Sequence, residues 1–533
     1  MKVLITDKIN SSAGDIISPV AEVDFLPTMS EDELVEKIGQ YDALMVRSQT
    51  KVTKKIIEAA NNLKIIGRAG VGVDNIDVEA ATQKGIIVVN SPDGNTTAAA
   101  EHTLALMFAM ARNIPDAAES TKAGKWERSK FTGTELMGKT LGIIGFGKIG
   151  SHVGHVAKAL GMNINVYDPF ASKEFVEKFG ATYFDNLDSF WAENDFITVH
   201  VPKTKDTINL INKDSIAKMK KGVRLVNCAR GGIINENDLK EAIESGVVAG
   251  CAIDVYENEP NIDTCPLIGL GKNAVLTPHL GASTTEAQLN VAIDVAEQIK
   301  EVLSGGSAKA AVNIPSLRPD KVEPVKDFMA LAENVGELSQ QLSNGAINKI
   351  EMKINGKLAE FDSSPLEIAM LKGLLSHQLE GVNYVNAPVI AKNRGIEFTT
   401  AKSTSGNDNK GEITVTIKTD KGETVVGGAM IAEDIARIVR INDYAMSISP
   451  QSHMLFVPHE NKLSMIAKVA TVLGENGINV SSMSVVQEHK KNKNNLSLMI
   501  INTDIDVNDS VLGKIETIDG VVSPKYIKLN NIK

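Results

Sequence analysis

A glycine-rich turn between a strand and a helix constrains the fold of this chain most. Residues 140–144 form a short apolar run, residues 151–160 have the composition of a helix, and the spacing G-x-G-x-x-G lies between them at Gly145, Gly147 and Gly150. Gly145 permits a sharp turn, Gly147 lets a pyrophosphate approach the backbone, and Gly150 lets helix and strand pack closely. Free N–H groups at the start of the helix complete an anion site. The segment therefore predicts a dinucleotide-binding unit in a doubly wound α/β domain.

An acidic residue after the next strand indicates which dinucleotide binds. Residues 163–167 read as a strand, and Asp168 follows directly. A carboxylate at this point accepts hydrogen bonds from a ribose and repels a 2′-phosphate, so NAD is favoured over NADP. Two alternatives stay open: Asp168 merely ends its strand, or a nearby Lys or Arg accommodates a 2′-phosphate in spite of it.

Composition limits the class of protein and its compartment. The length of 533 residues suggests three or four domains, and the chain has neither a signal-peptide pattern nor an apolar run of the roughly 18 residues that a membrane span needs. Cys228, Cys251 and Cys265 have neither disulfide-framework nor metal-ligand spacing, so we expect a cytoplasmic protein without a metal. A net charge of −10 argues against nucleic-acid and anionic-membrane partners. Any anionic ligand then requires a local cluster of arginines.

The N-terminal region and the region from residue 141 to residue 281 both alternate short apolar strands with helices. The first region has predicted strands at 2–6, 23–26, 43–46, 64–66 and 86–89 and helices at 32–38, 54–60 and 78–83. The second adds strands at 196–199, 223–227, 249–254 and 274–277 and a helix at 236–245, capped by Asn235 and stopped by Gly246. Long helices over residues 96–110 and 284–303 connect the regions. The pattern predicts two doubly wound parallel sheets that flank a cleft, with ligands at the carboxyl ends of the strands.

Arginines and glycines at two strand ends of the first sheet predict an anion site. Arg47-Ser48 follows one strand, and Arg68 follows another beside Gly70-Val71-Gly72, whose backbone N–H groups would be exposed to an anion. Arg128, in the polar stretch after the first long helix, either joins this cluster or is exposed.

Three strand ends of the second sheet carry an arginine, an acid and a histidine, namely Arg230, Glu259 and His279. Oxidation of a 2-hydroxy acid needs a base for the hydroxyl proton and a cation for the carboxylate. His279 suits the base, because imidazole titrates near neutral pH, and Glu259 can hold its ring. Arg230 can pair with carboxylate and carbonyl oxygens. Each residue alone also has an ordinary explanation: a histidine in a turn, a surface acid, or a salt bridge.

These segments resemble the D-2-hydroxyacid dehydrogenases, since residues 67–75, 227–232 and 278–284 read like that family over residues 1 to about 310. The resemblance implies Arg230, Glu259 and His279 as the catalytic set. It implies an NAD site formed by Gly145, Gly147, Lys148, Ile149, Gly150, Asp168, Val201, Cys228, Ala229, Arg230, Asp254, His279, Gly281 and Ala282. It implies substrate contacts from Arg47, Ser48, Arg68, Gly70, Val71, Gly72 and Arg128. The members that this chain resembles within the family oxidise 3-phospho-D-glycerate to 3-phosphohydroxypyruvate for serine synthesis, and they pair through their nucleotide domains as dimers or tetramers.

The sequence after about residue 310 has no recognisable set of catalytic residues of its own. Helices are predicted over 328–343 and 365–379, a strand over 349–354, and a hairpin begins at 412–418 with a turn at 420–422. This region resembles an intervening regulatory domain, with Lys392 and Arg394 as implied anion contacts. Residues 453–529 read strand, helix, strand, strand, helix, strand, with spans 454–457, 463–476, 480–488, 496–503, 511–515 and 526–529. The layout resembles an ACT domain, which implies that L-serine binds at His459, Asn461 and Asn479, although Leu463-Ser464 replaces the usual Pro-Gly.

The expected division is a substrate-binding domain at 1–97 and 283–307, an NAD-binding Rossmann domain at 98–282, an α+β regulatory domain at 308–451 and an α+β ACT domain at 452–533. Two other functions are compatible with the residues. One is a reductase of glyoxylate, hydroxypyruvate or D-lactate type, which Arg47 and Arg68 disfavour because those substrates lack a phosphate. The other is a nucleotide-sensing protein that binds NADH without turnover.

Overall fold

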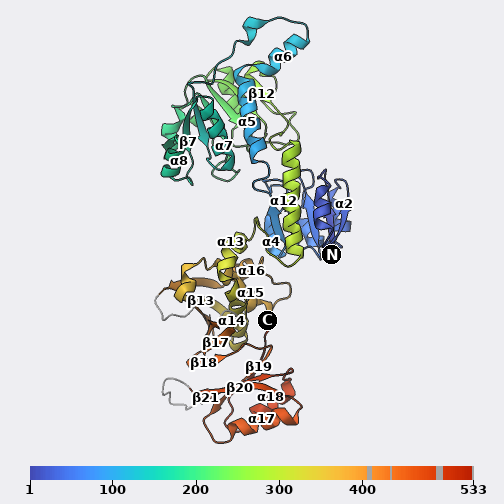
Figure 1. Ribbon diagram of the computed structural model, residues 1–533, viewed down its shortest axis with the longest axis vertical. Helices are drawn as coiled ribbons and strands as arrows, with labels where there is room; N and C mark the ends of the chain where they lie inside the picture. The colour runs from blue at the N-terminus through green and yellow to red at the C-terminus, as the bar shows by residue number, and fades with distance from the viewer. Residues whose placement is uncertain (405–410, 433–434, 488–495, 531–533) are drawn as a thin grey trace.

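The computed structural model describes residues 1–404, 411–432, 435–487 and 496–530. Figure 1 shows an elongated molecule in which four units follow one another along the long axis, although not in chain order. The unit built around β7 and α7 lies at one end, the N-terminal unit is next to it, and the two C-terminal units complete the molecule. No described helix combines the length and the apolar character needed to cross a membrane.

The N-terminal unit is a five-stranded parallel sheet of order β2-β1-β3-β4-β5. Its strands are β1 (Lys2–Ile5), β2 (Glu22–Phe25), β3 (Ala43–Val46), β4 (Ile65–Arg68) and β5 (Ile87–Asn90). Its helices are α1 (Ser12–Ile17), α2 (Glu31–Ile38), α3 (Lys54–Ala59), α4 (Val78–Gln83) and the returning α12 (Thr285–Leu303). The sheet is the predicted one. Helix α1 was not predicted, because six residues with a central glycine give too short a pattern.

Helix α12 completes the N-terminal unit from a distant part of the chain. It buries Val291, Val295 and Ile299 in one core with Val3 and Met45 of the sheet. Its N-cap Thr284 accepts a hydrogen bond from a backbone N–H in the first turn, which fixes where the helix begins. The helix therefore ties the loop that follows β12 to the first sheet.

The nucleotide-type unit is a seven-stranded parallel sheet of order β12-β11-β10-β9-β6-β7-β8. Its strands are β6 (Thr140–Ile144), β7 (Asn163–Tyr167), β8 (Thr182–Phe184), β9 (Phe196–Val199), β10 (Val223–Asn227), β11 (Val248–Ile253) and β12 (Ala274–Leu276). The helices around it are α5 (Thr96–Ala111), α7 (Lys148–Ala159), α8 (Lys173–Phe179), α9 (Leu187–Trp191), α10 (Lys213–Ile216) and α11 (Glu236–Glu244), with the short 3-10 helix η2 (Gly271–Asn273). The sheet confirms the second predicted doubly wound domain.

An arm projects from this unit at the end of α5 (Figure 1). It contains α6 (Ile114–Lys122) and the 3-10 helix η1 (Arg128–Phe131). Helix α6 has no buried residue. It was not predicted, because its sequence lacks the apolar stripe of a packed helix.

The third unit packs helices on a six-stranded sheet of order β14-β13-β15-β16-β17-β18. Its strands are β13 (Ile347–Asn355), β14 (Glu397–Ser403), β15 (Glu412–Thr419), β16 (Gly422–Ala432), β17 (Ile435–Ile441) and β18 (Tyr444–Ile448). Its helical segments are η3 (Pro315–Leu317), α13 (Pro319–Val322), η4 (Glu323–Val325), α14 (Lys326–Leu342), η5 (Gly356–Glu360), α15 (Ser364–Ser376) and α16 (Ala387–Asn393). The predicted hairpin is β15–β16, confirmed as an antiparallel pair.

The C-terminal unit is a split β-α-β fold, as predicted. Its antiparallel sheet has the order β20-β21-β19-β22. Its elements are β19 (His453–Glu460), α17 (Met465–Glu475), β20 (Val480–Gln487), β21 (Leu496–Thr503), α18 (Asp509–Glu516) and β22 (Lys525–Lys528). The second predicted strand of this unit, 480–488, extended to Glu488, which lies outside the described residues. One sheet face packs on α17 and α18, and the other contributes Met454 and Phe456 to the core of the third unit.

Candidate active site

A cleft of about 1490 Å³ lies between the two parallel sheets. The first sheet contributes Arg47, Ser48, Arg68 and Gly70 at the carboxyl ends of β3 and β4. The loops after β11 and β12 contribute other lining residues, namely Glu259, His279 and Ala282. The fold thus brings the predicted anion cluster and the predicted base into one cleft, as expected for strand ends in open α/β sheets.

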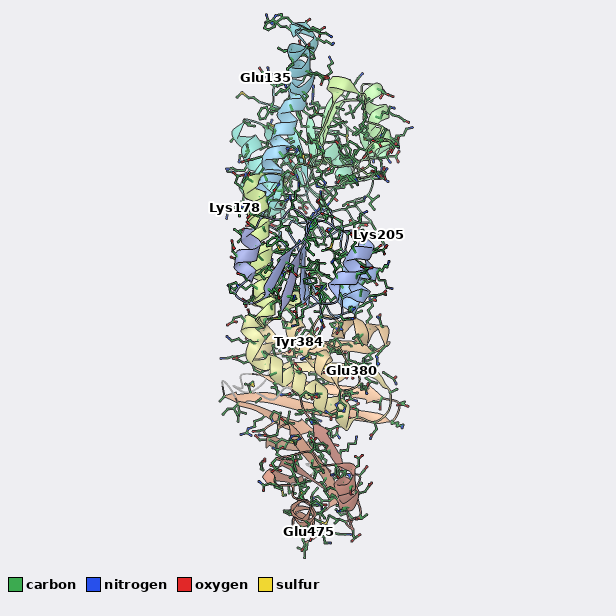
Figure 2. The ribbon with its side chains drawn as sticks, turned by 90° about the vertical axis from the view of Figure 1, so that its right-hand side faces the viewer. Glu135, Lys178, Lys205, Glu380, Tyr384 and Glu475 are labelled. Carbon is green, nitrogen blue, oxygen red and sulfur yellow. The ribbon has the colours of Figure 1, made fainter. Side chains whose placement is uncertain are left out.

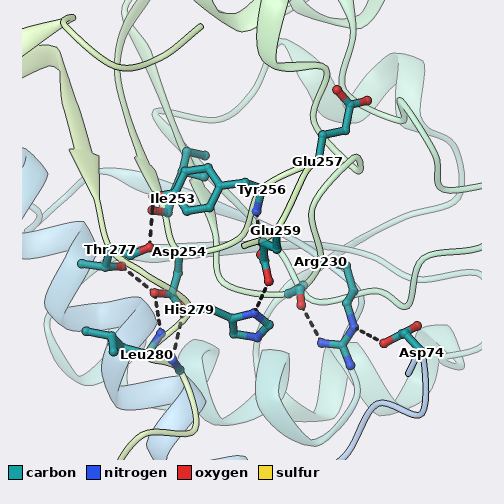
Figure 3. Close-up of polar contacts among 12 residues, drawn as sticks. Asp74, Arg230, Ile253, Asp254, Tyr256, Glu257, Glu259, Thr277, His279 and Leu280 are labelled. Carbon is teal, nitrogen blue, oxygen red and sulfur yellow. Dashed lines mark hydrogen bonds and ion pairs between the residues drawn. The ribbon is translucent and has the colours of Figure 1, made fainter. Parts of the chain in front are cut away.

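His279 and Glu259 form a hydrogen-bonded pair at the wall of this cleft (Figure 3). His279 Nδ1 lies 2.6 Å from Glu259 Oε2, and the other carboxylate oxygen accepts a hydrogen bond of 2.8 Å from the Tyr256 N–H. Burial raises the pKa of Glu259, but the hydrogen bonds from His279 and Tyr256 outweigh it and lower the pKa overall. An ionised carboxylate can only accept, so Nδ1 carries a hydrogen. Nε2 is thereby left to exchange a proton with a ligand, and the side chain is 47% exposed.

A buried carboxylate fixes the turn that carries His279. Asp254 is fully buried and accepts hydrogen bonds from Thr277 Oγ1 at 2.5 Å, Leu280 N at 2.8 Å and Gly281 N at 2.9 Å. His279 itself has a left-handed backbone with φ of 54°, which a residue other than glycine adopts only when its surroundings impose it. Asp254 therefore positions the turn that carries His279. The sequence had predicted only that Asp254 lies near the cofactor.

His102 on α5 is a polar residue of this network that the sequence did not reveal. Its Nε2 lies 3.1 Å from Asp254 Oδ1 and 3.3 Å from Thr277 Oγ1. Burial raises the pKa of Asp254, and the bonds from His102 and Thr277 more than offset it, so the net pKa is lowered. A single histidine in a helix of alanines and leucines carries no local signal, because its partner is 152 residues away.

Arg230 joins the two sides of the cleft. Its Nε donates to Asp74 Oδ2 at 3.2 Å, and its Nη1 donates to the Ala229 carbonyl at 2.7 Å. Asn227 Nδ2 donates to the Arg230 carbonyl at 2.9 Å and so orients the backbone. A Cβ added at Gly72 would lie 2.0 Å from Arg230 Nη2, so this glycine is required for the close approach of the two units. Arg230 is not itself among the residues that line the cleft and reaches it beside Asp74.

The remaining two arginines leave positive charge unsatisfied. Arg68 Nε is buried and has no hydrogen-bond partner among the described residues. Burial, and then repulsion from Arg230, lower the pKa of Arg68 to about 10, which leaves it charged at neutral pH. Burial also lowers the pKa of Arg47. A Cβ at Gly70 would lie 1.8 Å from Arg68 Nη1, so Gly70 keeps room for the guanidinium. Crowded, desolvated cations of this kind suit a multiply charged anion.

The glycine-rich turn has the geometry that a pyrophosphate requires. Gly145 has φ of +90°, and a Cβ at Gly150 would lie 2.0 Å from the Gly145 carbonyl oxygen. At Gly147 an added Cβ meets nothing within 4 Å, so the backbone at the start of α7 is open to a ligand. Asp168 Oδ2 accepts from the Phe146 N–H at 2.7 Å, which holds the acid against the turn. These residues fit a dinucleotide.

The other expected nucleotide residues surround this turn. An added Cβ at Gly145 would lie 2.8 Å from Val201 Cγ1, and Lys148 pairs with Asp93. Burial raises the pKa of Cys228 to about 12, so its thiol is neutral. Ile149 is a partly buried residue of the domain core, Ala229 precedes Arg230 on the loop after β10, and Gly281 and Ala282 belong to the turn that Asp254 holds.

Some expected residues are not brought to the cleft. Arg128 lies on η1 in the projecting arm and is exposed, so it does not join the arginine cluster of its own chain. Lys392 lines a different cavity, and the exposed Arg394 does not line it. Val71 lies between Gly70 and Gly72 beside the cleft and does not line it. No group of three His, Cys, Asp or Glu residues in the described ranges could hold a metal ion.

The implied effector residues lie at one end of the C-terminal sheet. His459 is 3% exposed, and its Nε2 has no hydrogen-bond partner in the described part of the chain. Asn461 and Asn479 are exposed. Ser464, at the position of the usual glycine, adopts φ of 65°. The turn therefore keeps the left-handed backbone although its residue is not glycine.

Three family models match the chain in order. They are the D-isomer specific 2-hydroxyacid dehydrogenase NAD binding domain over residues 104–281, the D-3-phosphoglycerate dehydrogenase intervening domain over 324–442, and the ACT domain over 453–520. The NAD-binding assignment of the glycine-rich unit is thereby confirmed.

Similar sequences and solved structures point to the same family as these models. D-3-phosphoglycerate dehydrogenase of Synechocystis sp. is 47% identical over 99% of this chain and 95% of its own length, and that of Methanocaldococcus jannaschii is 44% identical over 99% and 100%. Among solved structures, NAD⁺-bound 3-phosphoglycerate dehydrogenase of Entamoeba histolytica is 30% identical, with a TM-score of 0.50, over 59% of this chain and 98% of that one. A glyoxylate reductase of Paecilomyes thermophila is 32% identical, with a TM-score of 0.54, over 58% and 98%. The chain belongs to the D-3-phosphoglycerate dehydrogenase family.

Proposed function

We propose that this protein oxidises 3-phospho-D-glycerate to 3-phosphohydroxypyruvate with NAD, as the first step of L-serine synthesis. One observation carries the proposal. The His279–Glu259 pair shares a cleft with Arg47 and Arg68, and Arg230 reaches that cleft beside Asp74. A proton acceptor and excess positive charge in one cleft suit a phosphorylated 2-hydroxy acid.

The residues divide the chemistry between them. His279 Nε2 takes the proton of the C2 hydroxyl as hydride leaves C2, and Glu259 stabilises the imidazolium that forms. Arg230 holds the carboxylate and the developing carbonyl, whereas Arg68 and Arg47 hold the phosphate. NAD, when bound, supplies the hydride acceptor. A phosphate and a carboxylate together carry about three negative charges near neutral pH, which matches three arginines.

The cofactor is held by the residues around the glycine-rich turn. The backbone at Gly147 and the N-terminus of α7 receive the pyrophosphate, and Asp168 receives the ribose. The full set is the one that the resemblance implied, with Val201, Cys228 and Ala229 beside the turn and Gly281 and Ala282 beside His279.

The four-part division of the chain is also a proposal. The expected substrate-binding unit combines residues 1–97 and 283–307. A hydrogen bond of 2.7 Å from Val312 N to the Val88 carbonyl, and a bridge between Ala311 and Val89, favour extending this unit to residue 314. The remaining units are the NAD-binding unit of residues 98–282, a regulatory unit that is shortened to residues 315–451, and the ACT unit of residues 452–533.

We further propose a cytoplasmic homo-oligomer, a dimer or tetramer, that senses L-serine. The projecting arm supports subunit pairing, because Ile114 and Trp126 on it are 51% and 83% exposed. The unpartnered, buried Nε2 of His459 supports an amino-acid effector. Three free cysteines fit a reducing compartment. Size-exclusion with light scattering, and activity with increasing L-serine, test the two claims separately.

The substrate proposal is tested by NADH oxidation with four keto acids: 3-phosphohydroxypyruvate, hydroxypyruvate, glyoxylate and 2-oxoglutarate. We expect the phosphorylated acid to have the highest kcat/KM. Equal or higher values for an unphosphorylated acid would support the glyoxylate or lactate type of reductase instead. NADH binding without turnover of any of the four would support a nucleotide sensor.

A further inference from the structure

A second cavity, of about 640 Å³, lies at the junction of the N-terminal unit and the third unit. The N-terminal unit contributes Thr82 of α4, and Asn313 and Ile314 belong to the segment that connects the units. Helices α15 and α16 of the third unit provide most of the remaining wall. Figure 2 labels Tyr384, the neighbour in sequence of the lining residue Val385, at the level of this junction.

The wall of this junction cavity combines apolar side chains and a few uncharged polar ones with three charged residues, Glu367, Lys392 and Glu397. Glu397 forms an ion pair of 3.2 Å with Lys349. Ile368, Leu371 and Val385 are buried and form part of its floor. Glu367 on α15 and Lys392 on α16 both line it. Within the described ranges, Lys392 has no ion pair or side-chain hydrogen bond, and one oxygen of Glu367 accepts a hydrogen bond of 2.9 Å from Ser363 Oγ. Glu367 and Lys392 therefore do not neutralise each other, and both remain available to a ligand.

We propose that the junction cavity binds an amino acid with a branched or aromatic apolar side chain. Lys392 takes the carboxylate, Glu367 takes the ammonium group, and the side chain lies on the apolar floor. A ligand with only one charge would leave the other charged side chain without a partner, which is most costly for the half-buried Glu367. None of these residues belongs to the catalytic cleft or to the His459 region.

The cavity is connected to the catalytic cleft through α4. Thr82, near the C-terminus of α4, lines the junction cavity, while Asp77 and Asp74, just before the helix, line the cleft. Asp74 pairs with Arg230. A ligand that binds α15 and α16 against α4 therefore acts on the segment that contacts a catalytic arginine. Couplings between two binding sites typically change affinity by about 5- to 150-fold.

Calorimetric titration of the full-length protein tests the site. The probes are L-leucine and L-phenylalanine, with 4-methylpentanoate and 3-methylbutylamine as analogues that each carry one charge. We expect at least one of the two amino acids to bind, and each analogue to bind at least about tenfold more weakly, because it lacks one charge-assisted contact. Lys392→Gln and Glu367→Gln should each weaken binding of the amino acid by about the same factor.

Matched controls separate a local effect from a general loss of charge or of folding. Lys353 and Glu380 are exposed residues of the same unit, so Lys353→Gln and Glu380→Gln should leave the affinity unchanged. His459→Ala should also leave it unchanged, since that residue belongs to another unit. The proposal is overturned if neither amino acid binds at millimolar concentration, if the carboxylate analogue binds as tightly as the amino acid, or if Lys392→Gln, with an unchanged melting temperature, binds like the wild type.

Discussion

Replacing Arg68 should separate recognition of the phosphate from the rest of catalysis. In the structure its guanidinium is largely buried beside Arg47 and Arg230, and its Nε has no partner among the described residues. Arg68 therefore keeps an unsatisfied donor in the free protein, which a phosphate in the cleft would fill. In Arg68→Ala the methyl side chain leaves the phosphate short of one forked donor.

The size of the effect follows from the hydrogen bonds that the phosphate would no longer receive. A hydrogen bond to a charged group contributes about 1.5–3 kcal/mol, and a forked arginine makes up to two of them to a phosphate. We take about 3 kcal/mol as the loss, which corresponds to a roughly 10²-fold lower kcat/KM for 3-phosphohydroxypyruvate. Hydroxypyruvate lacks the phosphate, so its kcat/KM should change by only a few-fold.

Steady-state NADH oxidation with both substrates measures this difference. Lys54→Ala is a matched control, because Lys54 also lines the cleft but pairs with Glu58. It should affect both substrates equally and weakly. Arg68→Ala removes the burial cost of the charge and its repulsion from Arg230 and Arg47, but also its attraction to Asp74 and Asp7, so we expect a melting temperature close to that of the wild type. An equal loss of kcat/KM for both substrates would show that Arg68 binds the carboxylate and not the phosphate.

Three further outcomes follow from the same geometry. Glu259→Gln removes the carboxylate that accepts from His279 Nδ1 and fixes its hydrogen, so kcat for keto-acid reduction should fall while NADH affinity is unchanged; an unchanged kcat would argue against the pairing. Asp168→Ala should weaken NAD binding while leaving NADP binding unchanged or stronger, and equal losses in a fluorescence titration would mean that the ribose contact is elsewhere. Asp254→Asn should destabilise the fold near neutral pH by about 1–3 kcal/mol, because buried donors lose a charged acceptor. Because the pKa of Asp254 is lowered from 3.8 by folding, its contribution is present above pH 3.8 and is lost as pH falls through the folded pKa. The difference between variant and wild type in denaturant unfolding should therefore shrink in acid, and a constant difference would contradict the account.

The two parallel sheets were predictable because their strands are buried on both faces. All four residues of β3 and all four of β9 are buried, so each strand is a continuous apolar run with a polar loop after it. Strand β14 was missed for the opposite reason. Its residues are all exposed or half-buried, and its threonines, lysine and glutamate give no apolar run. Its pairing with β13 alone makes it a strand.

The candidate site was predictable only where strand ends supply its residues. Arg47, Arg68 and His279 follow apolar runs, so parallel topology alone brings them to one cleft. The role of His102 was not predicted, because the packing of a helix brings it to Asp254 and the local sequence has no signal for that contact. Arg128 was ambiguous for a related reason. It follows a helix whose direction the sequence does not fix, and it lies in the projecting arm.

The turnover of His279→Ala tests whether His279 is the general base of the reaction. The measurement pairs kcat for NADH oxidation with 3-phosphohydroxypyruvate and the affinity for NADH in the same preparation. We expect kcat to be lower by about 10²- to 10⁴-fold, the usual contribution of a positioned acid–base group, with NADH affinity close to that of the wild type. A kcat within a few-fold of the wild type would contradict the role of His279, whatever the substrate preference of the enzyme.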